Sequence, residues 1–516
     1  MVPGVDCYTL TGGYLGPDTY LPLVWMSKTD HVQYSRSIAS NIAVSNHDTV
    51  YTVTLNKKWH WSNGQPITAQ DVAYDAALVL AASGPTSPLA YCFTGEGGVP
   101  SLWKSVVAQG SDKVVITTTQ PVNPQWFIYN GLTQLVPIPK AQWDKYSNMN
   151  QELKWINSIG ANFENSVYKV VDGPYVPTRY VQDQYWEFKR NPQFDGSPKP
   201  SIPAITYHYE ASSDSTFLDL SKGNVQIAQI PLNYYKPMKA LTQYSIVPEP
   251  LFAFSQIQIN FRPNDAGNVG PLLNQLYIRQ ALQYGIDQKG ILKSILDGFG
   301  TLTNGPVPSV PPNPFYDSSM RLVDPFNPAK GKALLEAHGW TMQNGVMTKN
   351  GQKLQFVLLF GSGTPTTTDE MELIKANWAQ EGIAVTLESE APSTVGADVT
   401  NPADSSKWDL TPGGWIYAPD FDPGGDGLFN TGGGFNIGAY SNPTMDHLIH
   451  ETDLAGSPRQ IHSRFITYEQ YATAELPVLW APTADYVYAV NKDVVGFANN
   501  FSSYWSYTSD NYISFK

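Results

Sequence analysis

A strand–helix–strand pattern between residues 354 and 387 sets the strongest limit on the fold of this chain. The apolar run Leu354–Phe360 predicts a buried strand, Asp369–Gln380 has the spacing of an amphipathic helix, and Ile383–Leu387 predicts a second strand. Gly382 stands where a helix commonly ends in a left-handed conformation. A helix that links two neighbouring strands in this way makes them parallel, so the sequence predicts an α/β fold.

The length and composition are those of a globular chain with more than one domain. With 516 residues, of which 42% are hydrophobic, the chain can form two or three domains around a large core. Charged residues make up only 15% and aromatic residues 13%, a balance that suits contact with polar organic ligands. The net charge of −13 argues against a nucleic-acid partner. No apolar run is long enough to predict a membrane span.

The sequence predicts no cofactor and carries no recognised catalytic or metal-binding motif. Nucleophile-elbow, zinc-protease and phosphate-loop patterns are absent from it. His447 and His450 stand three apart on an expected helix without a third ligand in view. Cys7 and Cys92 either form one disulfide bond in an exported protein or remain two separate buried thiols, and both alternatives stay open.

The segment Gly413–Asn436, GGWIYAPDFDPGGDGLFNTGGGFN, is too rich in glycine for a regular helix or strand. Asp420, Asp422 and Gly425 match three positions of a calcium loop, but Thr431 stands where a bidentate Glu is required. In an extended chain the two Asp residues would lie about 7 Å apart, which suits an inverting glycosidase. Such pairs are also common in turns. The pattern therefore favours a third interpretation, an aromatic pocket wall.

Five segments resemble one known family, and they follow one another in the family's order. The first is the strand-turn-helix signature SNGQPITAQDVAYDAALVL, in which the matching positions are Asn63, Gly64, Pro66, Thr68, Ala69, Asp71 and Val72. The others are Gly173–Phe194, the helix YIRQALQYGIDQKGILKSIL with its GPVP connector, KALLEAHGW and YSNPTMDHLI. Together they are similar to the family 5 solute-binding proteins of ABC importers, of the oligopeptide, dipeptide and nickel-binding type, in an actinobacterial-like variant.

The resemblance implies a type II periplasmic-binding-protein fold of cluster C, with two lobes around a cleft and an extra domain. Domain I is then expected to comprise 1–40, 172–261 and 483–516, domain II the insertion 41–171, and domain III 262–482. The chain is expected to cross between the lobes near Ile259–Asn264 and near its C-terminal strands, where hinges would lie.

The function that the resemblance implies is binding rather than catalysis. The protein would capture a solute outside the cytoplasm, most simply an oligopeptide, and deliver it to the membrane subunits of an ABC permease. We expect a monomer, either a cell-surface lipoprotein or a periplasmic protein, whose signal segment is absent from this sequence. An oligosaccharide or a metal chelate is an alternative solute, and a secreted hydrolase with an Asp pair is the alternative from another class.

Peptide-binding members of the family carry G-W-x-x-D-Y-x-D-P, in which the first Asp holds the α-amino group of the peptide. Here Gly414-Trp415 and Asp422-Pro423 match, but one extra residue stands between them. The amine-binding position therefore falls on Ala418 or Pro419 unless Asp420 takes its place. Seven residues are expected to contact the ligand: Trp415, Tyr417, Asp420, Asp422, Trp25, Phe252 and Phe435.

Overall fold

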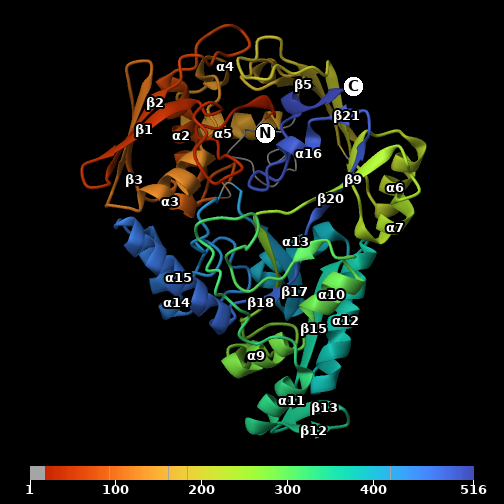
Figure 1. The fold of residues 1–516 in the computed structure, drawn as a ribbon. Coiled ribbons are helices and arrows are strands. Elements are labelled where there is room, and N and C mark those ends of the chain that lie inside the picture. Colours follow the sequence, from red (N-terminus) through yellow and green to blue (C-terminus); the bar gives the residue numbers. More distant parts are fainter. Residues whose placement is uncertain (1–17, 92, 161, 183, 419) are drawn as a thin grey trace.

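The structure is a computed structural model that describes residues 18–91, 93–160, 162–182, 184–418 and 420–516. It has two lobes stacked one above the other (Figure 1). The upper lobe contains the strands and helices of residues 18–249 and 486–516, and the lower lobe those of residues 253–481. Cys7 and Cys92, and with them the alternatives for a disulfide bond, lie outside the described residues.

The lower lobe is built on a five-stranded mixed sheet with the order β16-β15-β17-β10-β18. The bounds are β10 Ala253–Ile259, β15 Gln355–Gly361, β16 Ala384–Glu390, β17 Leu410–Ile416 and β18 Leu479–Ala481. Strands β15 and β16 pair in parallel and are linked by helix α12, Pro365–Glu381, which ends at Gly382 with φ of +82°. The predicted strand–helix–strand unit and the α/β class are therefore confirmed.

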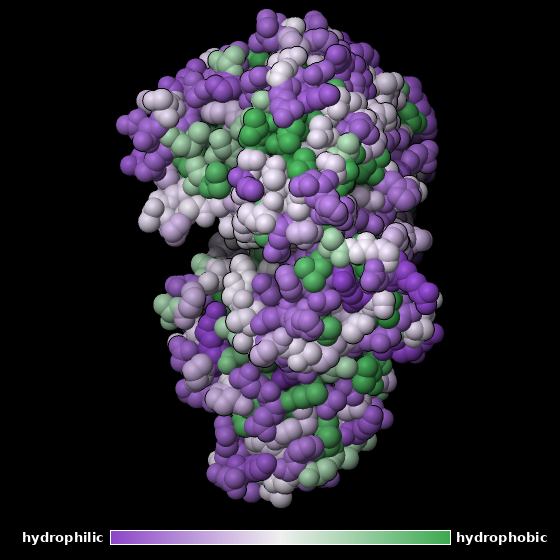
Figure 2. Space-filling view, turned by 90° about the vertical axis from the view of Figure 1, so that its left-hand side faces the viewer, coloured by the Kyte–Doolittle hydropathy of each residue, from purple (hydrophilic) through white to green (hydrophobic). Residues whose placement is uncertain are grey.

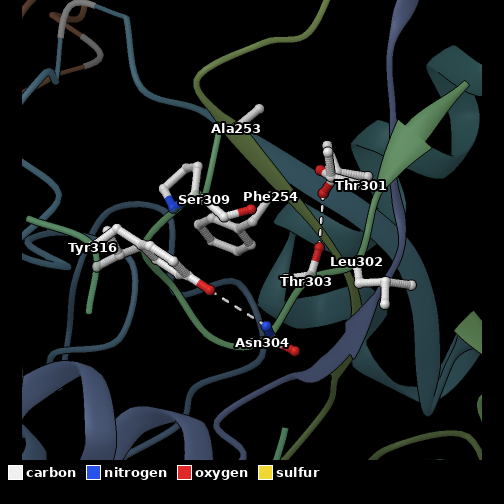
Figure 3. A pocket seen from close by; sticks show the side chains of 11 residues that line it. Ala253, Phe254, Thr301, Leu302, Thr303, Asn304, Ser309 and Tyr316 are labelled. Carbon is white, nitrogen blue, oxygen red and sulfur yellow. Dashed lines mark hydrogen bonds between the residues drawn. The ribbon is translucent and has the colours of Figure 1, made fainter. Parts of the chain in front are cut away.

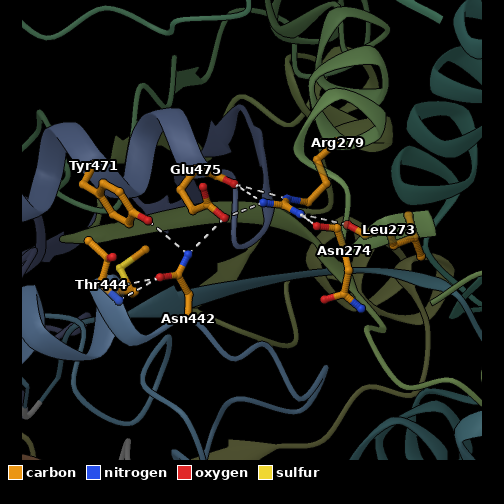
Figure 4. Close-up of polar contacts among 8 residues, drawn as sticks. Leu273, Asn274, Arg279, Asn442, Thr444, Tyr471 and Glu475 are labelled. Carbon is orange, nitrogen blue, oxygen red and sulfur yellow. Dashed lines mark hydrogen bonds and ion pairs between the residues drawn. The ribbon is translucent and has the colours of Figure 1, made fainter. Parts of the chain in front are cut away.

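The helices of the lower lobe surround this sheet, and a buried polar network joins three of them (Figure 4). The guanidinium of Arg279 on α9 (Leu276–Tyr284) forms an ion pair with Glu475 on α15 (Pro458–Glu475) at 2.6 Å. Asn442 caps α14 (Pro443–Asp453) and donates from Nδ2 to Glu475 Oε1 at 3.2 Å. The remaining larger helices are α10 Gln288–Ser294, α11 Pro328–Ala337 and α13 Pro392–Thr400.

In the upper lobe, an antiparallel sheet with the order β1-β2-β4-β3 carries helix α2, Ala69–Ala82. Its strands are β1 Ala39–Ser45, β2 Val50–Leu55, β3 Trp103–Gln109 and β4 Lys113–Thr118. The Asp71 carboxylate accepts a hydrogen bond from the Thr68 backbone N–H at 2.8 Å, so the predicted helix start is confirmed. Helix α5, Met149–Ile159, packs against α2 and is capped by Asn148.

Two smaller sheets complete the upper lobe and bring the C-terminal residues into it. One has the order β5-β6-β7, with bounds Tyr175–Val181, Tyr185–Arg190 and Ala204–His208. The other has the order β8-β20-β9, with bounds Ile227–Gln229, Tyr486–Asn491 and Tyr244–Glu249, and it lies beside helix α6, Ser213–Lys222 (Figure 1).

The sheets show where the chain passes between the lobes. Strand β9 pairs in the upper lobe and β10 in the lower one, so the first crossing lies at residues 250–252. The expected crossing near Ile259–Asn264, and with it the expected domain boundary at 261, lies one strand further along. Pro250 directly follows the end of β9 and precedes the change of lobe, whereas the pair Arg262-Pro263 follows β10. The second crossing lies between β18 and β20.

Throughout the described part of the chain, no helix combines the length and the apolar character needed to cross a membrane.

Candidate functional site

The glycine-rich segment Gly413–Asn436 was not expected to form a regular strand, but its residues 413–416 are the last part of β17 and pair with β10. Asp420 and the residues after it meet the upper lobe at the boundary between the lobes. Asn130, which lies on the upper lobe and is fully buried, pairs with the backbone of Asp422. Its Oδ1 accepts from the Asp422 N–H at 2.6 Å, and its Nδ2 donates to the Asp422 carbonyl at 2.8 Å. A space-filling view shows a notch between the upper and lower halves at this level (Figure 2).

Further hydrogen bonds cross the boundary beside this pair. Asn123, which caps the short helix α3 (Pro124–Trp126), donates from its backbone N–H to the Asp453 carbonyl at 2.6 Å. Its Nδ2 donates to the Thr452 carbonyl at 3.0 Å. The indole N–H of Trp126 donates to Asp426 Oδ2 at 2.6 Å. The lobes are therefore closed on each other, with α14 and α15 directly below α3 (Figure 1).

Two carboxyl groups of the segment are enclosed by this contact without hydrogen bonds. Asp420 is 2% exposed and Asp422 is 0% exposed, and neither carboxyl oxygen of either residue has a hydrogen-bond partner. Burial raises the pKa of both groups, and the neighbouring Asp426 raises it further. The Trp415 side chain partly opposes the rise in the pKa of Asp420, although its N–H does not reach hydrogen-bond geometry.

Four more carboxyl groups surround this pair, and with it they form what we term the carboxyl cluster: Asp30, Glu96, Asp420, Asp422, Asp426 and Asp453. Asp30 and Glu96 come from the upper lobe and are each 2% exposed, whereas Asp426 and Asp453 on the lower lobe are partly exposed. Burial raises the pKa of Asp30 and of Asp426 to about 7. Mutual repulsion raises the pKa of Glu96, mainly through Asp420, and of Asp453, mainly through Asp426, in addition to burial.

The raised pKa values have a direct consequence for the closed form. The closed form favours protonated carboxyl groups. Protonation therefore stabilises the closed form fully at acidic pH, and this contribution is lost as the pH rises through the raised pKa values. At neutral pH closure around these carboxyl groups alone is therefore unfavourable, and either opening of the lobes or a bound cation would relieve this cost. The upper-lobe residues Asp30, Glu96 and Asn130 were not expected from the sequence, because no local motif marks them.

Two glycines explain why the segment contains so much glycine. Gly425, with φ of +85°, lies against the hydroxyl of Tyr468, which any Cβ would overlap. Gly427, with φ of +70°, lies in the same way against the carboxyl group of Glu96. A positive φ together with such close approach requires glycine. These two glycines make room for a tyrosine of the lower lobe and a glutamate of the upper one.

Of the seven expected ligand contacts, Trp415 and Phe435 lie on the wall of the interlobe boundary. Their ring centroids are 4.5 Å apart, and Phe93 of the upper lobe lies 6.0 Å from Phe435. Both side chains are half-buried. The structure thus brings them to the same boundary as Asp420 and Asp422.

The other three expected contacts are packed inside the protein. The Tyr417 hydroxyl is buried and donates to the Pro306 carbonyl at 2.9 Å. Phe252 packs between Tyr417 and Tyr504, with centroid distances of 5.3 and 4.8 Å. Trp25 lies between the Trp505 ring and the Arg36 guanidinium, which is 3.8 Å from its centroid. These side chains support the boundary from behind, and a ligand role for them stays a prediction.

The arrangement of the side chains does not support the calcium or the hydrolase alternative. No group of three or more His, Cys, Asp or Glu side chains with metal-binding geometry occurs among the residues that the structure describes. A glycosidase pair needs one protonated and one ionised carboxyl group. Here burial raises the pKa of Asp420 and Asp422 alike.

A separate cavity of about 10 Å³ lies near the second crossing, between β10 and residues 301–309 (Figure 3). Its lining includes Phe254, Thr303 and Asn304. Thr303 and Thr483 share a hydrogen bond of 2.8 Å between their hydroxyl groups. The cavity has room for one water molecule and is too small for an organic solute.

Comparison with known proteins places this two-lobed arrangement in a family. The sequence model of the bacterial extracellular solute-binding proteins, family 5, matches residues 33–436. The chain belongs to this family. Family 5 proteins are extracellular or periplasmic binding components that work with ABC permeases. The match to the sequence model confirms the expected family. The likeness to solved structures of the family confirms the expected fold.

Individual family 5 proteins are similar to this chain at low sequence identity. The oligopeptide-binding protein OppA of Lactococcus lactis subsp. cremoris is 22% identical over 90% of this chain and 79% of its own length. The structure of AppA from Bacillus subtilis in complex with a nonapeptide superposes with a TM-score of 0.82 and 18% identity, covering 100% of this chain and 96% of that one. NikZ from Campylobacter jejuni in complex with Ni(L-His) gives a TM-score of 0.78 at 17% identity, covering 100% and 97%. These likenesses support the fold and leave the solute open.

Proposed function

We propose that this family 5 protein captures an oligopeptide between its lobes and delivers it to the membrane subunits of an ABC permease. The observation that carries the proposal is the pair of buried carboxyl groups of Asp420 and Asp422, whose oxygens have no hydrogen-bond partners where the lobes meet. Buried carboxylates need a counter-charge, and the α-amino group of a peptide would supply one. The similarity to oligopeptide-binding relatives, one of them solved with a nonapeptide, also supports a peptide as the solute.

In this proposal a peptide enters while the lobes are apart, and its amino group binds Asp420. Asp420 then acts in place of the expected positions Ala418 and Pro419, because of the extra residue in GWIYAPDFDP. Closure brings Asn130 onto the backbone of Asp422 and removes the bound group from water. Trp415 and Phe435 form the apolar side of the site, and Tyr417, Phe252 and Trp25 hold that side in place. The protein acts as a monomer, free in the periplasm or attached by a lipid.

Replacing Asp420 with asparagine tests the proposal. The variant keeps the shape of the side chain and removes its charge, so we expect the affinity for a pool of random pentapeptides to fall at least about tenfold. Isothermal titration calorimetry of wild type and variant measures the difference. Asp369→Asn is the matched control, because Asp369 is exposed on α12, away from the boundary.

An unchanged affinity for the pentapeptides in Asp420→Asn would overturn the assignment of Asp420. Binding of oligosaccharides by the wild type, together with no heat from the peptide pool, would favour the oligosaccharide alternative.

A further inference from the structure

The carboxyl cluster contains more carboxyl groups than one peptide amino group can compensate once they are ionised. Asp420 and Asp422 account for two of its six carboxyl groups. Glu96, Asp426 and Asp453 form a second set that spans both lobes, since Glu96 lies on the upper lobe and the other two on the lower one. Each of these three has a pKa raised by burial, and the pKa of Glu96 is raised further by Asp426 and Asp453.

In the part of the chain that the structure describes, no basic side chain pairs with this second set. Among the described residues, no Lys, Arg or His forms an ion pair with any member of the carboxyl cluster. Arg464 lies on helix α15, the helix that follows Asp453 in the chain, and its guanidinium has partners outside the carboxyl cluster. Its guanidinium forms an ion pair with Glu451 at 3.2 Å and donates to the Leu454 carbonyl at 2.9 Å. When the lobes close, these carboxyl groups therefore either stay protonated or ionise against a positive charge that comes from outside the chain.

A neutral side chain beside the set also lacks a partner. The hydroxyl of Tyr468 on α15 is fully buried and has no hydrogen bond. It lies against Gly425, directly before Asp426, and the charges of Asp426 and Asp420 contribute to the rise in its pKa. A buried hydroxyl without a partner costs free energy, and an ammonium or guanidinium group would donate to its oxygen.

We propose that the solute carries at least two positive charges, the second of which binds between the lobes to Glu96, Asp426 and Asp453 with the Tyr468 hydroxyl. This inference rests on the proposed function and narrows it to basic oligopeptides. The group that the site would bind is an ammonium or a guanidinium group. A lysine or arginine side chain supplies such a group, and a polyamine would supply one as well. Contacts from both lobes make the second charge favourable only in the closed form, so binding it drives closure.

The test compares pentapeptides that carry a single lysine at one position with pentapeptides that carry norleucine at the same position. Norleucine keeps an apolar chain of similar length and removes the charge. We expect at least one lysine position to bind about tenfold more tightly than its norleucine counterpart. In Asp426→Asn and Asp453→Asn this preference should shrink to about twofold or less, whereas Asp369→Asn should keep it. Asp420→Asn should weaken the lysine and norleucine peptides alike.

The outcomes separate this inference from the peptide proposal. Equal binding of lysine and norleucine peptides at every position would overturn the second charge site and leave peptide capture intact. Binding of spermidine, with no binding of any peptide, would support the second site and overturn the peptide proposal. A lysine preference that persists in both Asp426→Asn and Asp453→Asn would place the second charge elsewhere and overturn the inference. Thermal unfolding of each variant confirms that it is folded.

Discussion

Replacing Arg279 with methionine is expected to lower the free energy of unfolding by about 3–5 kcal/mol. Arg279 is 2% exposed, and its guanidinium donates to the Glu475 carboxylate and to the carbonyls of Leu273 and Asn274 (Figure 4). Methionine fills much of the space and removes every one of these donors. Glu475 is then left as an uncompensated charge between α9, α14 and α15, and such a charge costs more than a well-formed pair contributes.

Chemical denaturation followed by tryptophan fluorescence measures this loss. Arg459→Met is the control, because Arg459 is exposed on α15 and its replacement should change stability by about 0.5 kcal/mol or less. The double variant Arg279→Met, Glu475→Leu should recover a large part of the loss, since it removes the unpaired charge. A loss below about 1 kcal/mol in Arg279→Met would contradict the account of the network.

Replacing Asn130 with alanine is expected to weaken solute binding about thirtyfold without a comparable loss of stability. The two hydrogen bonds to the Asp422 backbone, at 2.6 and 2.8 Å, exist only while the lobes are closed. Their loss disfavours the closed form by about 2 kcal/mol, which corresponds to the expected change in affinity. In the open form, water satisfies the same backbone groups.

Calorimetry with a bound peptide and small-angle X-ray scattering together test this expectation. At a peptide concentration that closes the wild type, Asn130→Ala should retain the larger radius of gyration of the open form. Asn150→Ala, an exposed position on α5 of the same lobe, should behave like the wild type. Equal affinity and equal compaction in Asn130→Ala would show that the contact does not control closure.

Much of the fold could be predicted from local sequence patterns, because the residues that make up such a pattern contact one another in the structure. Gly382 ends α12 with a positive φ, and the Asp71 carboxylate accepts from the Thr68 N–H, as the sequence alone indicated. The site was harder to predict. Asp420 and Asp422 could be selected as candidates because they stand in a glycine-rich, aromatic segment, but their surroundings depend on residues about three hundred positions away in the chain.

The residues missed from the sequence share this dependence on distant contacts. Asn130 lies in a short π-helix, Phe127–Gly131, and Glu96 in a short 3-10 helix, Glu96–Gly98. Their place in the site becomes apparent only where the upper lobe meets the segment after β17. Tyr417 and Trp25 were predicted at the ligand because aromatic residues often line binding sites. The structure packs them against Pro306 and Trp505, and a ligand role for them stays a prediction. Composition indicates that aromatic contacts exist but not which of them face the cleft.

A peptide bound between the lobes can be identified by native mass spectrometry of the purified protein, followed by release of its contents under denaturing conditions. We expect a set of released molecules whose masses differ by amino-acid residues, with lysine and arginine over-represented. A series spaced by hexose units, or a single metal chelate, would show that the solute is not a peptide.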